Sequence, residues 1–169
     1  MFFIDKRVCV YSEIITDSSI LNSATKGFTE QQASGETRPK INVYSSYLSP
    51  FDVHKKTDKF DSLITRILHR TEDLAHDVFL LDRPYHCHQL WLAQYEAGDY
   101  ALNHNHFPVE FVATFYLDNT CDPIIFEDDI SLCPKAGELL IFPGFVQHKV
   151  PEVKHTRRVV ALNLSSATG

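Results

Sequence analysis

The chain has 169 residues, which is enough for one domain with a hydrophobic core but short for two. Its net charge of −6 argues against nucleic acid as a general partner. No apolar run approaches the roughly 20 residues that cross a bilayer. The four cysteines form no CxxC pair, so we expect no structural zinc site. Because nothing in the sequence points to export, we expect reduced thiols in a cytoplasmic protein, without a membrane partner. The sequence leaves a homodimer open.

The first half of the chain predicts elements that lie outside a main sheet. Residues 2–12 mix β-branched and aromatic residues, which predicts a strand. Residues 17–40 are polar with scattered Gly and Ser, so we expect a surface segment with at most a short helical turn. Between residues 59 and 79, apolar residues recur at i, i+3, i+4 and i+7. That spacing predicts one long helix, over about 59–80, that supports a sheet.

After Pro84 the sequence becomes a series of short strand-like runs separated by Gly, Pro, Asp and Asn. Many short strands at close spacing indicate a β-sandwich or jelly roll. We therefore predict a mainly β (α+β) single domain over 1–169. Its jelly-roll core, a double-stranded β-helix, spans about 84–166, and a strand and helix region occupies 1–83.

The run "ALNHNHFPVEF" at 101–111 contains candidate metal ligands. On a strand, His104 and His106 point to the same face, and two imidazoles on one face can chelate a borderline metal such as Fe, Zn, Cu or Ni. Alone, such a pair is weak evidence. However, His148 opens a late strand that can converge with the first at one mouth of a jelly roll. The three imidazoles then form a facial set with open positions.

Arg157 begins the last strand-like run, in "TRRVVALN". Strand alternation places Arg157 and Asn163 on one face and Arg158 on the other, where we expect a solvated surface charge. An inward Arg in a small barrel is costly unless it meets an anion, and a guanidinium matches a carboxylate. Arg157 therefore predicts an acidic co-substrate, and pairing with an internal Asp or Glu is the structural alternative.

Between about Trp91 and Asn163, four landmarks follow one another: Tyr95, Gly98, Tyr100 and His104, then "FYLD" at 115–118, "FPGFVQHKVP" at 142–151, and Arg157. With these landmarks in this order, the segment resembles the iron(II)- and 2-oxoglutarate-dependent oxygenases. The likeness is to the prolyl-hydroxylase-like branch, and more closely still to small bacterial and phage members of the superfamily.

The resemblance implies oxidation of an unactivated C–H bond, coupled to decarboxylation of 2-oxoglutarate with O₂. By position, His104 and His148 match the two metal histidines, and Arg157 matches the residue that pairs with the distal carboxylate of 2-oxoglutarate. Tyr95 and Tyr116 match tyrosines that border the co-substrate.

Asn163 ends the last strand as in the closer relatives. The primary substrate, a small molecule or a peptide, would lie over the barrel mouth between loops such as 17–40 and 119–123. Peptidyl proline follows only by analogy.

The sequence departs from the family pattern at the third metal ligand. His106 stands where the carboxylate of the usual triad is expected, so iron(II) held by three imidazoles would carry one negative charge less from its ligands. Alternatively, His106 contacts the ligands without binding the metal itself, and Glu110 or water completes the ligand set. A second pair, His86 and His88, lacks a third ligand nearby and is interpreted as a strand edge.

Two alternatives of other classes stay open. The spacing of Gly98, His104, His106 and Glu110, followed by Gly137, Pro143 and His148, resembles the two cupin motifs. That would make Glu110 a fourth ligand of a metal enzyme without 2-oxoglutarate. Leu117, Phe145 and Glu152 depart from the cupin pattern, and Arg157 would have no role in it. The third class is a catalytically silent binding module.

Overall fold

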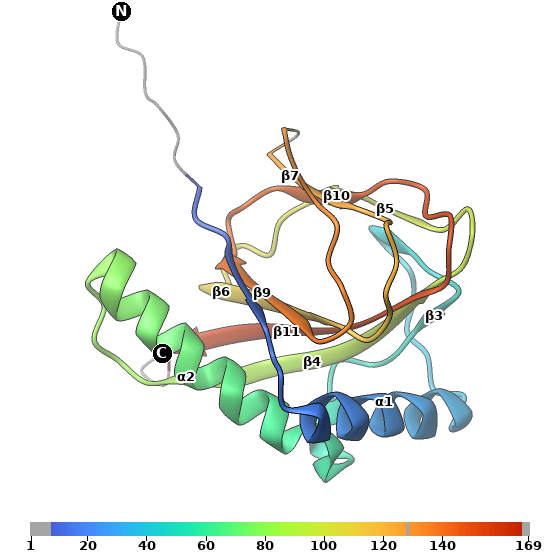
Figure 1. The fold of residues 1–169 in the computed structure, drawn as a ribbon, viewed down its shortest axis with the longest axis horizontal. Helices are drawn as coiled ribbons and strands as arrows, with labels where there is room; N and C mark the ends of the chain where they lie inside the picture. The colour runs from blue at the N-terminus through green and yellow to red at the C-terminus, as the bar shows by residue number, and fades with distance from the viewer. Residues whose placement is uncertain (1–7, 128, 167–169) are drawn as a thin grey trace, which may run out of the picture.

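The computed structural model describes residues 8–127 and 129–166, and it consists of two β-sheets with two helices on one side (Figure 1). Every pair of neighbouring strands within the sheets is antiparallel. The larger sheet runs in the order β1 (Tyr11–Ile14), β9 (Glu138–Pro143), β6 (Phe111–Tyr116), β11 (Arg157–Ser166), β4 (Tyr85–Tyr95) and β3 (Tyr47–Leu48). The smaller sheet runs in the order β2 (Val43–Tyr44), β5 (Tyr100–His104), β10 (His148–Val150), β7 (Ile124–Phe126) and β8 (Ile130–Leu132).

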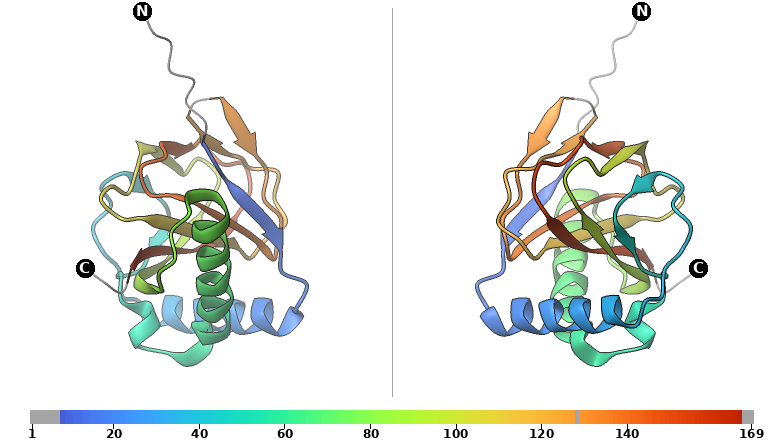
Figure 2. Two further views of the ribbon diagram at one scale, coloured as in Figure 1. Left: turned by 90° about the vertical axis from the view of Figure 1, so that its left-hand side faces the viewer. Right: turned by 90° about the vertical axis from the view of Figure 1, so that its right-hand side faces the viewer.

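The larger sheet lies between the smaller sheet and the two helices, as the side views show (Figure 2). Because both faces of the sheet are covered, β6 near its centre is buried at all six positions. Alternate residues of β11 serve two cores: Val160 and Leu162 pack toward the helices, whereas Val159 and Ala161 pack between the sheets. The second of these cores contains the candidate site.

Helix α2 (Asp61–Phe79) confirms the long helix predicted from periodicity. Its buried residues, Leu63, Ile67, Thr71, Leu74 and Ala75, recur at the predicted spacing. The helix ends at Leu80, which adopts a left-handed conformation with φ 55°. None of the helices in the described part of the chain is long and apolar enough to cross a membrane.

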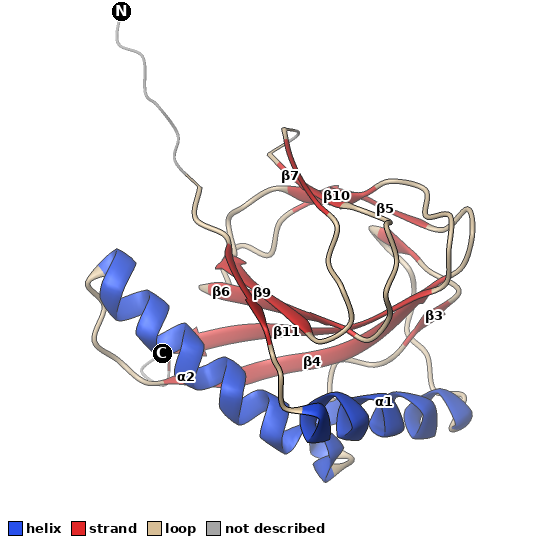
Figure 3. Ribbon diagram, in the orientation of Figure 1, coloured by secondary structure: helices blue, strands red, loops and turns tan. Residues whose placement is uncertain are grey.

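The expectation that 17–40 contains at most a short helical turn was wrong. Residues Ser18–Ala33 form helix α1, which begins at Asp17, whose side chain accepts a hydrogen bond from the backbone N–H of Ser19. The helix docks through Ala24, Gly27 and Phe28, which are buried. Figure 3 shows α1 and α2 on the same side of the larger sheet.

The jelly-roll prediction is confirmed, since eight strands, β4 to β11, follow Pro84 in the described part of the chain. The N-terminal strand is displaced: β1 covers Tyr11–Ile14, and residues 2–7 of the predicted strand lie outside the described residues. Two short 3₁₀ helices, Val53–Lys55 and Asp58–Phe60, lead into α2.

Candidate metal centre

Strand pairing brings His104 and His148 together. The two residues are direct partners across the antiparallel pair β5–β10, so their side chains lie on the same face. Their ring centroids are 4.4 Å apart. Two histidines that are 44 positions apart in the sequence therefore become neighbours at the ends of two adjoining strands.

His106 lies beyond the end of β5 and is held by other contacts. Its backbone N–H donates to the carbonyl of Gly144 at 2.7 Å, and its ring stacks on Trp91 with centroids 5.7 Å apart. Gly144 is required at this crossing, since a Cβ there would lie 1.9 Å from the carbonyl oxygen of Val109. The Pro-Gly turn before β10 thus positions the third histidine.

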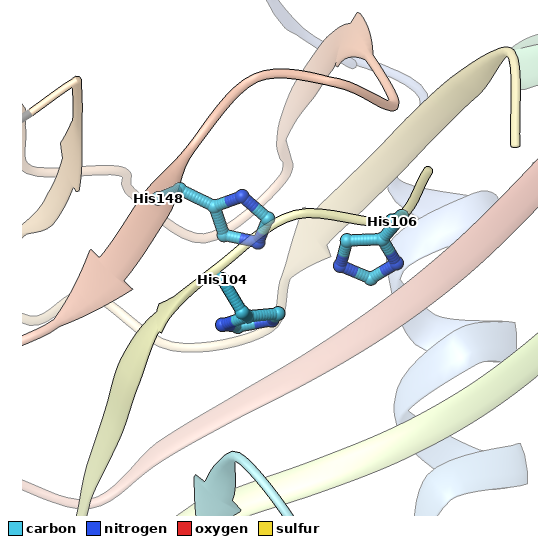
Figure 4. Close-up of side chains that lie close together, drawn as sticks. All are labelled: His104, His106 and His148. Atoms are coloured by element: carbon cyan, nitrogen blue, oxygen red, sulfur yellow. The ribbon is translucent and has the colours of Figure 1, made fainter. Parts of the chain in front are cut away.

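Figure 4 shows the three imidazoles pointing toward one another. One ring nitrogen from each of His104, His106 and His148 lies within 4.8 Å of the others. Residues 8–127 and 129–166 contain no second group of three or more potential ligands. His86 and His88 are exposed on β4 with ring centroids 6.4 Å apart, as expected of a strand edge.

In each of the three imidazoles, a hydrogen bond engages Nδ1 and leaves Nε2 free. Nδ1 of His104 lies 2.7 Å from the carbonyl of Leu102, and Nδ1 of His148 lies 3.1 Å from the carbonyl of Val146. Nδ1 of His106 lies 2.8 Å from Oδ1 of Asn163. Because these oxygens can only accept, each neutral ring carries its proton on Nδ1 and keeps a lone pair on Nε2. Such hydrogen bonds are typical of metal-bound histidines.

The imidazoles are also neutral at physiological pH. Burial, together with the positive charge that His104 would carry, lowers the pKa of His106 to about 4. Burial and the two neighbouring imidazoles lower the pKa of His148 to about 3, and burial lowers that of His104. Three neutral nitrogen donors suit a borderline divalent metal, and three protein ligands leave positions open for a substrate. The residues present therefore fit a catalytic metal.

The structure places Glu110 away from this cluster. One oxygen of its carboxylate accepts from the hydroxyl of Ser166 at 2.7 Å, and the other lies 2.9 Å from a guanidinium nitrogen of Arg83. Glu110 therefore lies outside the histidine cluster, contrary to the arrangement that a cupin-type site would need. No carboxylate joins the three histidines within the described residues.

Arg157 is almost completely buried, with 2% of its surface exposed, on the inner face of the larger sheet. Nη1 donates to the carbonyl oxygens of Asp122 and Pro123 at 2.9 and 3.3 Å. Nε is buried without a hydrogen-bond partner, and none of the described carboxylates forms an ion pair with this side chain. The alternative of an internal Asp or Glu partner is therefore not found in residues 8–127 and 129–166, and Arg157 keeps binding capacity for an anion.

A cavity connects Arg157 to the histidines. Its walls include the three imidazoles, the Arg157 guanidinium, and the rings of Tyr95 and Tyr116. The guanidinium carbon lies 5.2 Å from the centre of the Tyr95 ring and 5.5 Å from that of Tyr116, within cation–π range. Burial raises the pKa of Tyr95 to about 12, so the ring is neutral and can donate its hydroxyl proton.

The neighbouring Arg158 differs from its expected role. Its side chain is on the opposite face, as strand alternation predicts, but it is not a solvated charge. The guanidinium binds both carboxylate oxygens of Asp118, at 3.0 and 2.6 Å. Two consecutive arginines thus contrast: Arg158 has a carboxylate partner, whereas Arg157 has none among the described residues.

Asn163 lies beside the histidine cluster rather than beside Arg157. Its Nδ2 donates to Oε1 of Gln89 at 2.7 Å, which fixes the amide so that Oδ1 faces His106. Gln89 was not predicted from the sequence, because it becomes a neighbour of Asn163 only through the pairing of β4 with β11. Asn163 therefore orients a candidate ligand.

Comparisons with solved structures identify the class of fold. A prolyl-4-hydroxylase from Pseudomonas putida superposes with a TM-score of 0.70 at 16% identity, covering 92% of both chains. The viral collagen prolyl hydroxylase from Paramecium Bursaria Chlorella virus-1, solved with 2-oxoglutarate, gives 0.62 at 14%, covering 92% of this chain and 94% of that one. HygX from Streptomyces hygroscopicus, solved with nickel and 2-oxoglutarate, gives 0.66 at 10%, covering 95% and 83%.

No family model matches the sequence, and no curated protein matches it either. The chain therefore has the fold of the 2-oxoglutarate- and iron(II)-dependent oxygenases, and the predicted resemblance is confirmed at the level of the fold. At 10–16% identity, the likeness extends to the fold alone.

Proposed function

We propose that this protein is an iron(II)- and 2-oxoglutarate-dependent oxygenase, in which His104, His106 and His148 hold the metal. The observation that carries the proposal is the buried, unpaired Arg157 in the same cavity as the three histidines. A dianion that chelates a metal at one end and presents a carboxylate at the other suits this arrangement.

Each residue has a specific task in this proposal. The three Nε2 atoms bind the metal, and the acceptors on Nδ1 keep each ring in one tautomer. Arg157 binds the distal carboxylate of 2-oxoglutarate, beside the Tyr95 and Tyr116 rings. Iron(II) with 2-oxoglutarate and O₂ supplies an oxidant for an unactivated C–H bond, and the apolar cavity walls exclude water from it.

The test is anaerobic addition of iron(II) and then 2-oxoglutarate to the full chain. We expect the visible charge-transfer band of a metal-chelated 2-oxo acid. Arg157→Gln removes a buried charged contact, which is worth about 2–5 kcal/mol, and so the band should require roughly 30-fold or more 2-oxoglutarate. Arg157→Lys retains the positive charge but lacks the planar guanidinium. The 2-oxoglutarate concentration that its band requires should therefore lie between those of the wild type and Arg157→Gln.

Arg158→Gln is the matched control, because it removes the adjacent guanidinium from the other face of the same strand. Its band should saturate at the wild-type concentration. Equal 2-oxoglutarate requirements for the folded Arg157 and Arg158 variants would refute the role of Arg157. Metal binding that is unaffected by 2-oxoglutarate would instead indicate a metal enzyme without this co-substrate, and failure to bind metal would indicate a silent module.

A further inference from the structure

A second cavity adjoins the histidine cluster, and the proposed co-substrate does not account for it. It shares His104, His106, Val43 and Trp91 with the Arg157 cavity. The rest of its wall comes from the segment after α1, from the residues just before the 3₁₀ helix at Val53–Lys55, and from facing positions on β4 and β11: Arg38, Ile41, Asn42, Phe51, Gln89 and Asn163. A ligand in this cavity would therefore approach the histidine cluster from a different side than a ligand bound to Arg157.

Arg38 is the one ionised side chain that this second cavity presents, and it is held in place. Its backbone N–H donates to the carbonyl of Leu48 at 3.1 Å. Its guanidinium carbon lies 3.9 Å above the centre of the Phe51 ring and 5.9 Å from that of Trp91. Two aromatic rings thus fix the plane and position of the guanidinium.

The Arg38 side chain has no anionic partner. Its Nε is buried without a hydrogen-bond partner, and it forms no ion pair with any carboxylate in residues 8–127 and 129–166. Burial lowers its pKa to about 10, so it still carries its charge at neutral pH. A half-buried, unpaired cation beside a reaction site is costly to stability, and an anionic ligand would offset that cost.

We infer that Arg38 binds a carboxylate of the primary substrate, with the apolar part of that substrate lying against Phe51 and Trp91 beside the metal cluster. The assignment of this ligand as a substrate rests on the proposed function, whereas the binding of a carboxylate at Arg38 does not. The carboxylate can belong to a small organic acid or to an acidic side chain in a peptide. Both sources present the same group to the guanidinium fork.

The test measures binding rather than turnover. Calorimetry on the full chain with Zn²⁺ and saturating 2-oxoglutarate compares two pairs of probes. Phenylacetate is paired with phenylacetamide, and acetyl-Ala-Glu-Ala-amide with acetyl-Ala-Gln-Ala-amide. We expect one acidic probe to bind at least tenfold more tightly than its neutral partner, because hydrogen bonds to charged groups are the stronger class. The pair that shows the preference identifies the source of the carboxylate.

Arg38→Gln should abolish that tenfold preference, and Arg38→Lys should retain only part of it. If Arg38→Gln does not fold by circular dichroism, the lysine variant decides, since loss of the fork alone should reduce the preference several-fold. Lys40→Gln is the matched control: it removes an exposed cation two residues away and should leave the preference intact. An acid preference that persists in the folded Arg38 variants, or its absence from the wild type, would overturn the inference.

The anaerobic charge-transfer band separates this inference from the proposed function. Arg38→Gln should give the band at the wild-type concentration of 2-oxoglutarate. If that variant loses the band, Arg38 holds the co-substrate and the inference is wrong. If the wild type gives no band, the proposed function fails, and the acid preference measured with Zn²⁺ alone still decides whether Arg38 binds carboxylates.

Discussion

The contact between Asn163 and His106 provides a test of the metal site that does not depend on turnover. Asn163→Leu keeps the approximate volume of the side chain but removes the oxygen that accepts from Nδ1 of His106 at 2.8 Å. It also removes the side-chain N–H that donates a hydrogen bond to Oε1 of Gln89 at 2.7 Å. The ring of His106 then keeps its stacking contact with Trp91 but loses the partner that fixes its tautomer.

The magnitude follows from these two hydrogen bonds. Loss of an outer partner of a metal-bound histidine lowers metal affinity about 10- to 100-fold, which corresponds to about 1.4–2.8 kcal/mol. Buried groups left without a partner also cost about 1–3 kcal/mol each, so we expect the metal-free variant to be less stable. Asn163→Asp supplies a stronger acceptor to the imidazole and should retain wild-type affinity or exceed it.

The assay is competition between the protein and a chelator of known affinity for Zn²⁺, with urea unfolding of each metal-free variant alongside. Asn103→Leu is the control, because it makes the same change at an exposed position of β5. If folded Asn163→Leu binds Zn²⁺ as tightly as Asn103→Leu does, Asn163 does not orient a ligand and the reasoning is refuted.

Three further outcomes follow from the structure. Zn²⁺ at 100 times its dissociation constant should stabilise the chain by about 2.7 kcal/mol and raise Tm by roughly 5–10 °C, reversibly with a chelator. Gly144→Ala should destabilise the fold by about 1–3 kcal/mol in urea, because its Cβ would lie 1.9 Å from the Val109 carbonyl oxygen. Burial raises the pKa of Asp122, but hydrogen bonds from the backbone of Lys154 and His155 outweigh it and lower that pKa below 3.8. The carboxylate therefore contributes stability above pH 3.8 that is lost as pH falls through the lowered pKa, and Asp122→Asn should flatten this acid limb of a stability–pH curve.

Strand alternation accounts for what the sequence predicted best. Side chains on a strand change face at every residue, so the inward position of Arg157 and the outward position of Arg158 could be read from the run "TRRVVALN". The close spacing of short strand-like runs after Pro84 predicted the jelly roll, and the 3.6-residue periodicity of α2 predicted its long helix. These features depend on local patterns of polarity.

Helix α1 could not be predicted this way because its buried face is small. A glycine in a helix interior ordinarily indicates a break, and Gly27 stands near the middle of α1. Its reason is a close approach, since a Cβ on Gly27 would lie 2.7 Å from the Cβ of Lys59. The helix is thus fixed by tertiary packing against residues that are more than 30 positions away.

The sequence also could not decide between Glu110 and His106 as the third ligand. Both follow His104 at plausible spacing, and the choice depends on long-range partners: Arg83 and Ser166 engage Glu110, whereas Asn163 engages His106. No role was predicted for Arg38 from the sequence, because the aromatic rings that hold its guanidinium belong to other segments of the chain.

The charge of the two cavities favours anionic ligands more strongly than a site with a carboxylate ligand would. Three neutral imidazoles leave both positive charges of a divalent metal uncompensated, and Arg38 and Arg157 add two more. None of the residues that line these cavities is an Asp or a Glu. The co-substrate dianion would reduce this local charge of about +4 to about +2, and a substrate carboxylate would reduce it to about +1. Although the whole chain carries a net charge of −6, we expect this centre, once it holds a metal, to favour acids, and replacing His106 by a carboxylate should weaken that preference.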